Sequence, residues 1–596
     1  MLKLLKKLGK KEWLLALVCL ALIFTQVWLE LKMPDYMSQI TRLVQTEGSQ
    51  MSEIVKNGAY MLGCALGSLV AAVITGYIAS SISSTFSMKL RKNIFDKVEN
   101  MGMQEVKSFS TSSLITRTTN DVTQIEMLIA MGLQLLIKAP ITAVWAITKI
   151  LNKSWQWSVA TAIAVVVLLS VIGMLTIIVL PRFKKVQKLI DKINGVTREN
   201  LTGIRVVRAF NAEKYQEDKF EDTNNKLTNL QLFNQKKFAI MQPTMYLTMY
   251  ALTLSIYFIG AILIKDSLMA NKLTLFSDMI VFSSYALQVI MSFLMLAMIF
   301  MMLPRAQVSA NRINEVLDTD ISIKTGKKKS GKKGEVGTVE FKNVSFKYPD
   351  ADEYLLKNIS FKANKGETVA FIGSTGSGKS TLINLVPRFY DATDGEVLID
   401  GVNVKEYDTN SLNNKIGYVP QKAVMFNGTV NSNIAYGDNG KGKITDKKIH
   451  EAAQVAQAKE FIEKMDETYN SHIAQGGTNV SGGQKQRLAI ARAIARDPEI
   501  YIFDDSFSAL DYKTDSVLRK ELKKYTKDAT SLIVAQRIGT IMNADKIIVL
   551  EDGKSVGMGT HKELLKTCEV YKQIALSQLS KEELENAWWR KWNKNS

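Results

Sequence analysis

The chain has 596 residues, more than one domain usually holds, and 46% of them are hydrophobic although its mean hydropathy is +0.00. A strongly apolar part must therefore be balanced by a strongly polar one. The net charge of +19 gathers beside long apolar segments, and no nucleic-acid-binding motif accompanies it, so a lipid bilayer and not a nucleic acid is the expected partner. The three cysteines share no motif spacing, so neither a disulfide framework nor a metal site is indicated.

Six apolar runs in the first half of the chain are long enough to cross a hydrocarbon core about 30 Å thick, which takes about 20 helical residues. They are roughly 13–31, 60–79, 127–148, 157–180, 239–264 and 279–303. Pro140 and Pro243 lie within the third and fifth runs, where a membrane helix tolerates a kink. The long loops after the second and fourth runs keep helical periodicity, which predicts that the membrane helices continue past the bilayer and return as hairpins.

Lysine and arginine are concentrated before the first run and in the two long loops. The positive-inside rule then places both termini in the cytoplasm, as expected for a multi-pass protein of the plasma membrane. Glu30 lies near the outer end of the first run, where snorkelling to the interface is the default expectation. Lys138 lies midway along the third run, and the sequence leaves open whether it lines a pathway. The methionines of the sixth run suit helix packing, which we favour, or a permissive cavity.

Residues 318–336 are polar, rich in lysine and punctuated by glycine, which predicts a solvated tether. Short β-branched runs then alternate with helical ones, a pattern typical of an α/β domain. The stretch GSTGSGKS, Gly373–Ser380, follows the strand-like ETVAFI and precedes the helical TLINLV, which is the context of a phosphate-binding loop. Its glycines let backbone N–H groups approach phosphates. Lys379 would reach the terminal phosphates, and the Ser380 hydroxyl would bind Mg²⁺.

About 100 residues further on, SGGQ (Ser481–Gln484) opens a second helical pattern, whose N-terminus would also attract phosphate. It cannot readily serve the phosphate loop of its own chain, because that loop already has a helix over the same phosphates. A second copy that faces the first could place this helix end at the phosphates. The apolar run IYIF then ends in Asp504 and Asp505. The first acid after such a strand would hold Mg²⁺, and the second would be placed to activate water.

These motifs resemble those of the ATP-binding cassette (ABC) exporter family, and the resemblance runs essentially end to end. It identifies the Walker A motif as Gly373, Ser374, Thr375, Gly376, Ser377, Gly378, Lys379, Ser380 and Thr381. It identifies the signature as Ser481, Gly482, Gly483 and Gln484, and the D-loop as Ser508, Ala509, Leu510 and Asp511. IYIFDD matches the Walker B strand. Tyr348 matches the aromatic residue that stacks on adenine, and Gln421 matches the Q-loop glutamine that touches Mg²⁺.

The resemblance implies an α-helical membrane domain of six transmembrane helices, followed by one α/β P-loop cassette. Two such halves dimerise, and each ATP lies between the Walker A motif of one half and the signature of the other. Residues 112–121 and 203–215 resemble the first and second cytoplasmic loops of exporters, the second of which carries a coupling helix that docks onto the opposite cassette.

The implied domains are a membrane domain at 1–317, a basic linker at 318–336, a cassette at 337–580 and a tail at 581–596. The tail clusters Trp588, Trp589 and Trp592 among basic residues. Contact with a membrane surface or another subunit would suit this composition, and a frayed terminus is the simpler interpretation.

Two catalytic positions depart from the family pattern. The general base of the family is a glutamate, and here it is Asp505; the switch histidine lies in a VAHR-like segment, and here IVAQR places Gln536 there. A misplacement of about 1 Å can cost about 10²-fold in rate, and glutamine cannot become cationic as histidine can. Lys379, Ser380 and Asp504 remain. We therefore expect a site that holds ATP and Mg²⁺ but cleaves ATP slowly or not at all.

An intact signature beside a weakened base resembles the degenerate-site subunit of heterodimeric exporters, many of them bacterial multidrug pumps. The partner half would supply the working glutamate and histidine, and most hydrolysis would occur at the site built on its Walker motifs. Two alternatives remain: a homodimeric exporter of lipids or peptides, and a membrane protein that gates or senses ATP without pumping. The spans suit drugs, lipids or peptides equally. The composition, rich in lysine and asparagine, hints at a bacterium of low GC content.

Overall fold

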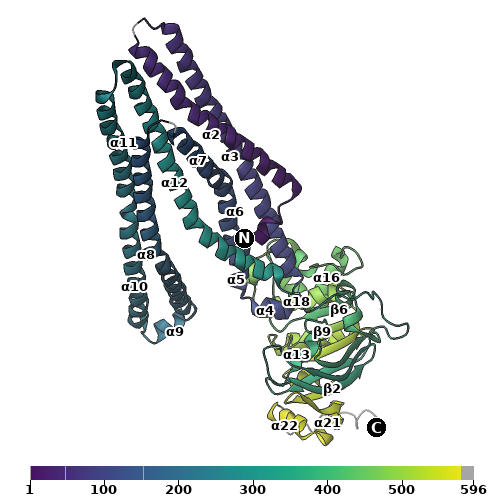
Figure 1. Cartoon of the computed structure of the whole chain (residues 1–596). Helices are drawn as coiled ribbons and strands as arrows, with labels where there is room; N and C mark the ends of the chain where they lie inside the picture. Colours follow the sequence, from purple (N-terminus) through teal and green to yellow (C-terminus); the bar gives the residue numbers. More distant parts are fainter. Residues whose placement is uncertain (1, 47, 152, 579–596) are drawn as a thin grey trace, which may run out of the picture. The chain divides into compact units, whose positions relative to one another are not determined.

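Figure 1 shows a computed structural model of the chain, which describes residues 2–46, 48–151 and 153–578. The chain forms two compact units. The first consists of Met1–Glu99 and Thr111–Thr319, and the second of Asn100–Ser110 and Asp320–Ser596. A short segment between two membrane helices, Asn100–Ser110, thus packs with the second unit. The residues of the predicted tail, with Trp588, Trp589 and Trp592, lie outside the described part of the chain.

The first unit is helical and confirms the six apolar spans. Within the described residues, six helical segments are long and apolar enough to cross a membrane. Its helices are α1 (Leu2–Leu5), α2 (Lys10–Gln45), α3 (Met51–Glu99), α5 (Thr111–Thr118), α6 (Asn120–Met131), α7 (Ile137–Leu151), α8 (Trp155–Thr202), α9 (Ile204–Ala209), α10 (Glu213–Ala239), α11 (Met241–Asp266) and α12 (Met269–Asp318). The 49 residues of α3 span about 74 Å at 1.5 Å per residue, far more than a hydrocarbon core. The long helices therefore continue past the bilayer, as their periodicity predicts.

The third span contains a local irregularity next to its charged residue. Gly132–Leu136 forms a π-helical turn between α6 and α7, and Pro140 follows within α7. Proline has no N–H to donate to the preceding turn, and a wider turn is one way a helix accommodates that loss. Lys138 is therefore presented from a distorted part of the span.

Lys138 and Glu30 form an ion pair inside the first unit. Lys138 Nζ lies 2.8 Å from Glu30 Oε1, and the same oxygen accepts hydrogen bonds from Gln26 and Ser68 at 2.9 and 3.1 Å. Both charged side chains are only about one-fifth exposed. A charge inside a membrane span is costly unless it is paired. The snorkelling expected for Glu30 is therefore corrected to a pairing of α2 with α7, and Lys138 has a partner of opposite charge.

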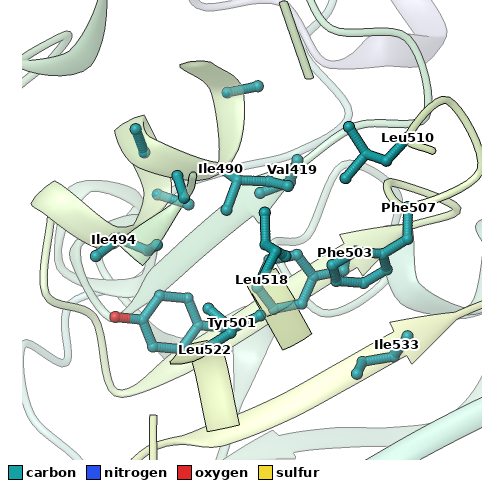
Figure 2. Packing of buried hydrophobic residues seen from close by; sticks show 14 of the residues in the cluster. Val419, Ile490, Ile494, Tyr501, Phe503, Phe507, Leu510, Leu518, Leu522 and Ile533 are labelled. Carbon is teal, nitrogen blue, oxygen red and sulfur yellow. The ribbon is translucent and has the colours of Figure 1, made fainter. Parts of the chain in front are cut away.

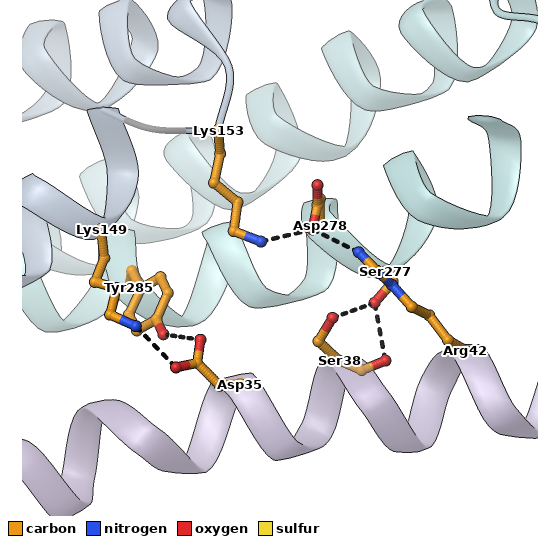
Figure 3. A network of polar contacts seen from close by, with 8 residues as sticks. All are labelled: Asp35, Ser38, Arg42, Lys149, Lys153, Ser277, Asp278 and Tyr285. Atoms are coloured by element: carbon orange, nitrogen blue, oxygen red, sulfur yellow. Dashed lines mark hydrogen bonds and ion pairs between the residues drawn. The ribbon is translucent and has the colours of Figure 1, made fainter.

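A second polar network joins α2, α7 and α12 farther along α2 (Figure 3). Asp35 accepts from Lys149 at 2.8 Å and from the Tyr285 hydroxyl at 2.7 Å. Asp278 lies 2.6 Å from Lys153 and 3.4 Å from Arg42. The members are Asp35, Ser38, Arg42, Lys149, Lys153, Ser277, Asp278 and Tyr285. These contacts link the later part of α2 and the end of α7 to the beginning of α12, and the partly buried charges are paired with one another.

The second unit contains the α/β domain that the alternating pattern predicts. Its strands are β1 (Val339–Phe346), β2 (Leu356–Ala363), β3 (Thr368–Gly373), β4 (Asp394–Ile399), β5 (Val402–Asn403), β6 (Ile416–Val419), β7 (Gly428–Thr429), β8 (His472–Ile473), β9 (Ile500–Asp504), β10 (Thr530–Val534), β11 (Lys546–Glu551) and β12 (Lys554–Gly559). In the described residues they form an antiparallel sheet in the order β2-β1-β4-β5, a six-stranded sheet in the order β12-β11-β3-β10-β9-β6, and the pair β7-β8. In the six-stranded sheet β11, β3, β10, β9 and β6 run parallel, so their carboxyl ends meet at one edge, where ligands of such sheets bind.

Helices complete this unit. They are α4 (Met103–Ser108), α13 (Lys379–Asn384), α14 (Thr409–Asn414), α15 (Val430–Ile434), α16 (Asp446–Val455), α17 (Lys459–Glu463), α18 (Gly482–Ala495), α19 (Tyr512–Tyr525), α20 (Ile538–Ile541), α21 (His561–Thr567) and α22 (Glu569–Gln578), with short 3₁₀ turns at Val404–Glu406, Thr468–Asn470 and Gln475–Gly477.

The core beside β9 determines where the site residues lie (Figure 2). All five residues of β9 are buried, as in a parallel strand covered on both faces. The contacts drawn there include Tyr501 and Phe503 of β9, Ile533 of β10, Ile490 and Ile494 of α18, and Leu518 and Leu522 of α19. A well-packed core of this kind holds both the carboxyl end of β9 and the helix α18 in fixed positions.

The lysine-rich linker is docked on the cassette, which corrects the solvated tether expected from its composition. The N–H of Gly326 donates to the Tyr407 carbonyl at 2.8 Å, and the N–H of Lys332 donates to the Asp400 carbonyl at 2.9 Å. A Cβ at Gly326 would come within 2.1 Å of the Glu406 carbonyl oxygen. The glycines therefore allow two backbones to approach closely, and composition alone does not distinguish this role from flexibility.

Candidate nucleotide-binding site

The phosphate loop connects β3 to α13 at the carboxyl edge of the six-stranded sheet. The strand ends at Gly373 and the helix begins at Lys379, as the sequence predicts. Gly376 and Gly378 have φ values of +87° and +93°, a left-handed conformation that side chains other than glycine rarely adopt. A Cβ at Gly373 would lie 2.0 Å from the Leu550 carbonyl oxygen. Glycine at these three positions is thus a requirement of the backbone path.

Lys379 is held over this loop by the loop itself. Its Nζ donates to the carbonyls of Gly373 and Ser374 at 3.0 and 2.7 Å and to Ser377 Oγ at 3.3 Å. Burial lowers the pKa of the Lys379 ammonium, while the charges of Asp505 and Asp504 oppose that shift. Ser374, Thr375 and Gly376 are exposed at the top of the loop. The ammonium is therefore anchored by neutral carbonyls at the place where a phosphate would compensate it better.

Ser380 and Asp504 form a pair suited to Mg²⁺. The Ser380 hydroxyl donates to Asp504 Oδ1 at 2.7 Å, and Asp504 is 5% exposed. A hydroxyl and a carboxylate are the hard oxygen ligands that Mg²⁺ takes from proteins when substrate phosphates supply the others. The described residues contain no cluster of three His, Cys, Asp or Glu side chains that could hold a metal alone. The donor set therefore fits a metal that arrives with a nucleotide.

Gln421, Asp505 and Gln536 converge on one carboxylate oxygen. Asp505 Oδ2 accepts from Gln536 Nε2 at 2.9 Å and from Gln421 Nε2 at 3.3 Å. These residues follow β6, β9 and β10, whose carboxyl ends are adjacent. Sequence motifs place each residue near the nucleotide, but they do not reveal that two amides bind the same carboxylate.

The surroundings of Asp505 are tight. It is 8% exposed and has a φ of +45°, and its backbone N–H donates to the Val534 carbonyl at 3.0 Å. Burial raises the pKa of the Asp505 carboxyl, an effect opposed by its hydrogen bonds. A cavity of about 10 Å³ lined by Asp505, Gln536 and Arg537 is at the lower limit for one water molecule. Arg537, the last residue of the IVAQR segment, was given no role of its own in the sequence analysis and is brought here by the turn after β10.

Tyr348 contacts the far end of the Walker A motif. Its hydroxyl lies 2.9 Å from the Thr381 hydroxyl in a hydrogen bond, and its ring makes edge contacts with Phe346 and Tyr390. The adenine-stacking position predicted from the resemblance is therefore next to the phosphate loop. Lys107 of α4, which the sequence analysis did not single out for a role of its own, lies with its Nζ 5.0 Å from the centre of the same ring.

The signature forms the start of α18. Ser481 caps the helix by accepting from the N–H of Gln484 at 3.3 Å, and the Gln484 side chain accepts from the N–H of Ser481 at 2.8 Å. Ser481 and Gly482 are exposed, and a Cβ at Gly482 would meet nothing within 4 Å. Within the described residues, no hydrogen bond joins the signature to the phosphate loop. The helix end is thus capped and exposed, and it is not hydrogen-bonded to the phosphate loop of its own chain in the described residues.

The D-loop lies between Asp505 and the signature within the cassette. Ser508 Oγ donates to the Asp505 carbonyl at 2.9 Å, and Asp511 caps α19 by accepting from the Thr514 N–H at 2.9 Å. The Ala509 carbonyl is the nearest atom to a Cβ built at Gly483, at 3.4 Å. Leu510 is buried in the core, so the loop is anchored at its centre.

The second predicted loop contains a short helix with an apolar surface. Between α8 and α10, α9 exposes Val206, and Phe210, which follows it directly, is 79% exposed. An exposed phenylalanine at the tip of a helical hairpin is typical of a contact with another protein surface.

Family models match both units. The ABC transporter transmembrane region matches residues 13–293, and the ABC transporter model matches residues 356–508. An uncharacterised ABC transporter ATP-binding protein of Mycobacterium tuberculosis is 40% identical over 530 residues, which cover 88% of this chain and 89% of that protein.

More distant relatives carry functional names. A multidrug resistance ABC transporter ATP-binding and permease protein of Lactococcus lactis is 30% identical, covering 91% of this chain and 90% of that protein. An ATP-dependent lipid A-core flippase of Pseudomonas aeruginosa is 32% identical, covering 82% and 79%. The solved structure of a bacterial Atm1-family ABC exporter with ATP bound superposes with a TM-score of 0.81 at 22% identity, covering 96% of this chain and 100% of that one.

The fold and the motifs define an ABC exporter half, with six apolar helices and one cassette. The chain belongs to the ABC transporter family, and ATP-driven transport across a membrane is its activity as a class.

Proposed function

We propose that the chain is one subunit of a heterodimeric exporter and that the site built on its own Walker motifs holds Mg·ATP without efficient hydrolysis. The observation that carries the proposal is the pair of amide hydrogen bonds from Gln421 and Gln536 to Asp505. A general base needs an oxygen free to accept a proton from water. Here one of the two Asp505 oxygens, Oδ2, already accepts two hydrogen bonds, which hold the carboxylate in place, and neither amide can take up or release a proton.

The length of the carboxylate reinforces this argument. Asp505 follows a fully buried strand, and its backbone N–H is tied to β10, so the main chain cannot shift to compensate for the missing methylene. A displacement of about 1 Å from the reacting geometry costs about 10²-fold in rate. Nucleotide binding depends on other groups, chiefly Lys379, Ser380 and Asp504. Weak hydrolysis and sound binding are therefore compatible at this site.

The signature supports the second half of the proposal. Ser481 and the first N–H groups of α18 form a capped, exposed helix end, which attracts phosphate. In a dimer of facing cassettes this end would complete the ATP site of a partner that has the family glutamate and histidine. The working site of the pair would then depend on Ser481–Gln484 of this chain.

The transported compounds are proposed to be amphipathic. The multidrug relative in L. lactis favours drug-like substrates. They would be exported across the plasma membrane, with both termini and the cassette in the cytoplasm. The flippase relative in P. aeruginosa favours a second candidate, a homodimeric exporter of lipids. A protein that senses ATP without pumping is the third, and nothing in the described residues favours it over these two.

ATP turnover of the purified chain tests the proposal. In nanodiscs without a partner, the chain should bind Mg·ATP but hydrolyse it at least about 10²-fold more slowly than the complex with a partner that has both family residues. A self-dimer that turns over as fast as the complex would overturn the degenerate site and support the homodimer. Uptake of a fluorescent drug into vesicles, with hydrolysable and non-hydrolysable ATP, separates pumping from sensing.

A further inference from the structure

Residues 100–110 lie within the compact unit that contains the cassette, although α3 and α5 on either side belong to the other unit. The contacts of this segment with the rest of the unit include the following three. The N–H of Ser322 donates to Glu105 Oε1 at 3.2 Å, Ile323 lies beside Gly102, and the Lys107 ammonium lies 5.0 Å from the centre of the Tyr348 ring. The first two contacts involve the linker. The third involves the residue proposed to stack on adenine.

Tyr348 makes several contacts in this state. Its hydroxyl bonds to Thr381, Phe346 and Tyr390 make edge contacts with its ring, and Lys107 lies over the ring. A base can stack only on a ring face that is free. Stacking of a base on an aromatic ring is stronger than an exposed cation–π contact, so a nucleotide can displace the lysine but loses part of its binding energy in doing so.

We propose that Lys107 competes with adenine for the face of Tyr348, so that nucleotide binding and the docking of residues 100–110 on the cassette oppose each other. The inference rests on the proposed function, because it takes Tyr348 as the adenine-stacking residue. Lys107 is then a positioning residue, which acts on the nucleotide through Tyr348. Linkage makes the effect reciprocal. If the lysine contact weakens ATP binding by a given factor, bound ATP weakens the docking of α4 on the cassette by the same factor.

The chain offers a matched control for this contact. Lys347, directly before Tyr348, places its ammonium 5.8 Å from the centre of a different ring, that of Tyr354. Both lysines are exposed. Lys347 is next to Tyr348 in the sequence, and Lys107 is next to it in space. Removing either one takes away one positive charge that would attract ATP. Only Lys107→Ala frees the ring of Tyr348.

Equilibrium binding to the full chain in nanodiscs tests the proposal, with Mg·ATP and with magnesium tripolyphosphate, which has no base. Lys107→Ala should tighten ATP binding by about twofold to fivefold, which is the size of an exposed cation–π contact, and leave tripolyphosphate binding unchanged or slightly weaker. Lys107→Arg, which keeps a cation for the ring, should resemble the unaltered chain. Lys347→Ala should leave ATP binding unchanged or weaken it slightly.

Two results would overturn the competition: weaker or unchanged ATP binding in Lys107→Ala, or an equal gain for tripolyphosphate. Tyr348→Ala separates this failure from a failure of the proposed site. If that variant binds ATP as well as the unaltered chain, Tyr348 does not stack on adenine and its assigned role is wrong. If it binds ATP more weakly while Lys107→Ala shows no gain, the adenine site stands and only the competition fails. Hydrogen exchange of residues 100–110 provides a second readout and should quicken on addition of ATP but not of tripolyphosphate.

Discussion

The two ends of the cassette that would face ATP differ in how their polar groups are satisfied. At the Walker end, Lys379 is bound by loop carbonyls, and Asp505 is bound by two amides. At the signature end, Ser481 and Gln484 cap α18 but leave its tip exposed. The Walker end has the groups to bind a nucleotide and holds Asp505 Oδ2 by two amides, while the signature end is capped and exposed. Under the proposed function, the chain is passive at its own site and essential at the site of its partner.

The largest test of this contrast compares one change at each end in the assembled complex. Gly482→Asp puts a carboxylate at the phosphate-facing end of α18, and ATP turnover should fall by at least about 10²-fold because the added charge opposes the helix field. Asp505→Ala should change turnover by less than about twofold, because this carboxylate is proposed to do little catalysis.

Gly482→Ala is the matched control, since a Cβ at this position meets nothing within 4 Å and its backbone is not left-handed. Turnover close to that of the unaltered complex is expected, so that the loss in Gly482→Asp reports charge and not folding. Comparable losses in Gly482→Asp and Asp505→Ala would remove the contrast between the two ends.

A second test restores the Walker end. Asp505→Glu combined with Gln536→His should raise ATP turnover of the chain alone by about 10-fold to 10²-fold, because the longer carboxylate recovers its reach and histidine can be protonated. Each single change should give less, since Gln536 and Asp505 are hydrogen-bonded to each other. Adding Lys379→Ala to the double variant should abolish the gain, and a gain that survives it would come from another site.

A third test separates the two roles of Ser481. Ser481→Ala removes a helix cap, which should cost about 1 kcal/mol and lower the midpoint of thermal unfolding of the cassette. Thr560 caps α21 with the same reciprocal hydrogen bonds, and no site residue lies in that helix. Thr560→Ala should lower stability by a similar amount and leave turnover of the complex unchanged, whereas Ser481→Ala should lower both. Equal turnover in the two variants would show that Ser481 only caps its helix and has no role in turnover.

The smallest expected effect concerns pH. Burial raises the pKa of Asp504 above its usual 3.8, so the carboxyl takes up a proton at a higher pH than an exposed aspartate does. Mg²⁺ requires the ionised form, and its contribution to ATP binding should therefore fade as the pH drops, before ordinary aspartates titrate. The D-loop behaves oppositely, since the Thr514 N–H lowers the pKa of Asp511. ATP affinity measured with Mg²⁺ and with EDTA across acidic pH checks this, and a constant ratio contradicts it.

Local sequence is sufficient for the phosphate loop, the signature and the membrane spans. The glycines of Gly373–Gly378 are needed by the backbone of the loop itself, and the cap of α18 is formed by residues three positions apart. Long apolar runs predict spans because the bilayer sets their length. The same local reasoning was wrong about the linker and about Glu30, since it cannot see which distant backbone or charge will lie beside them.

The sequence by itself determined the class of protein and the residue types at each catalytic position, because these depend on spacing along the chain, but not that residues 100–110 pack with the second unit. Only the tertiary structure decided that Gln421, Asp505 and Gln536 meet at one oxygen, that Lys138 pairs with Glu30, and that Lys107 lies on Tyr348. Each of these contacts joins residues from different strands or helices. The physical reason is that hydrogen bonds and ion pairs act over about 3 Å, and packing alone brings such groups within that reach.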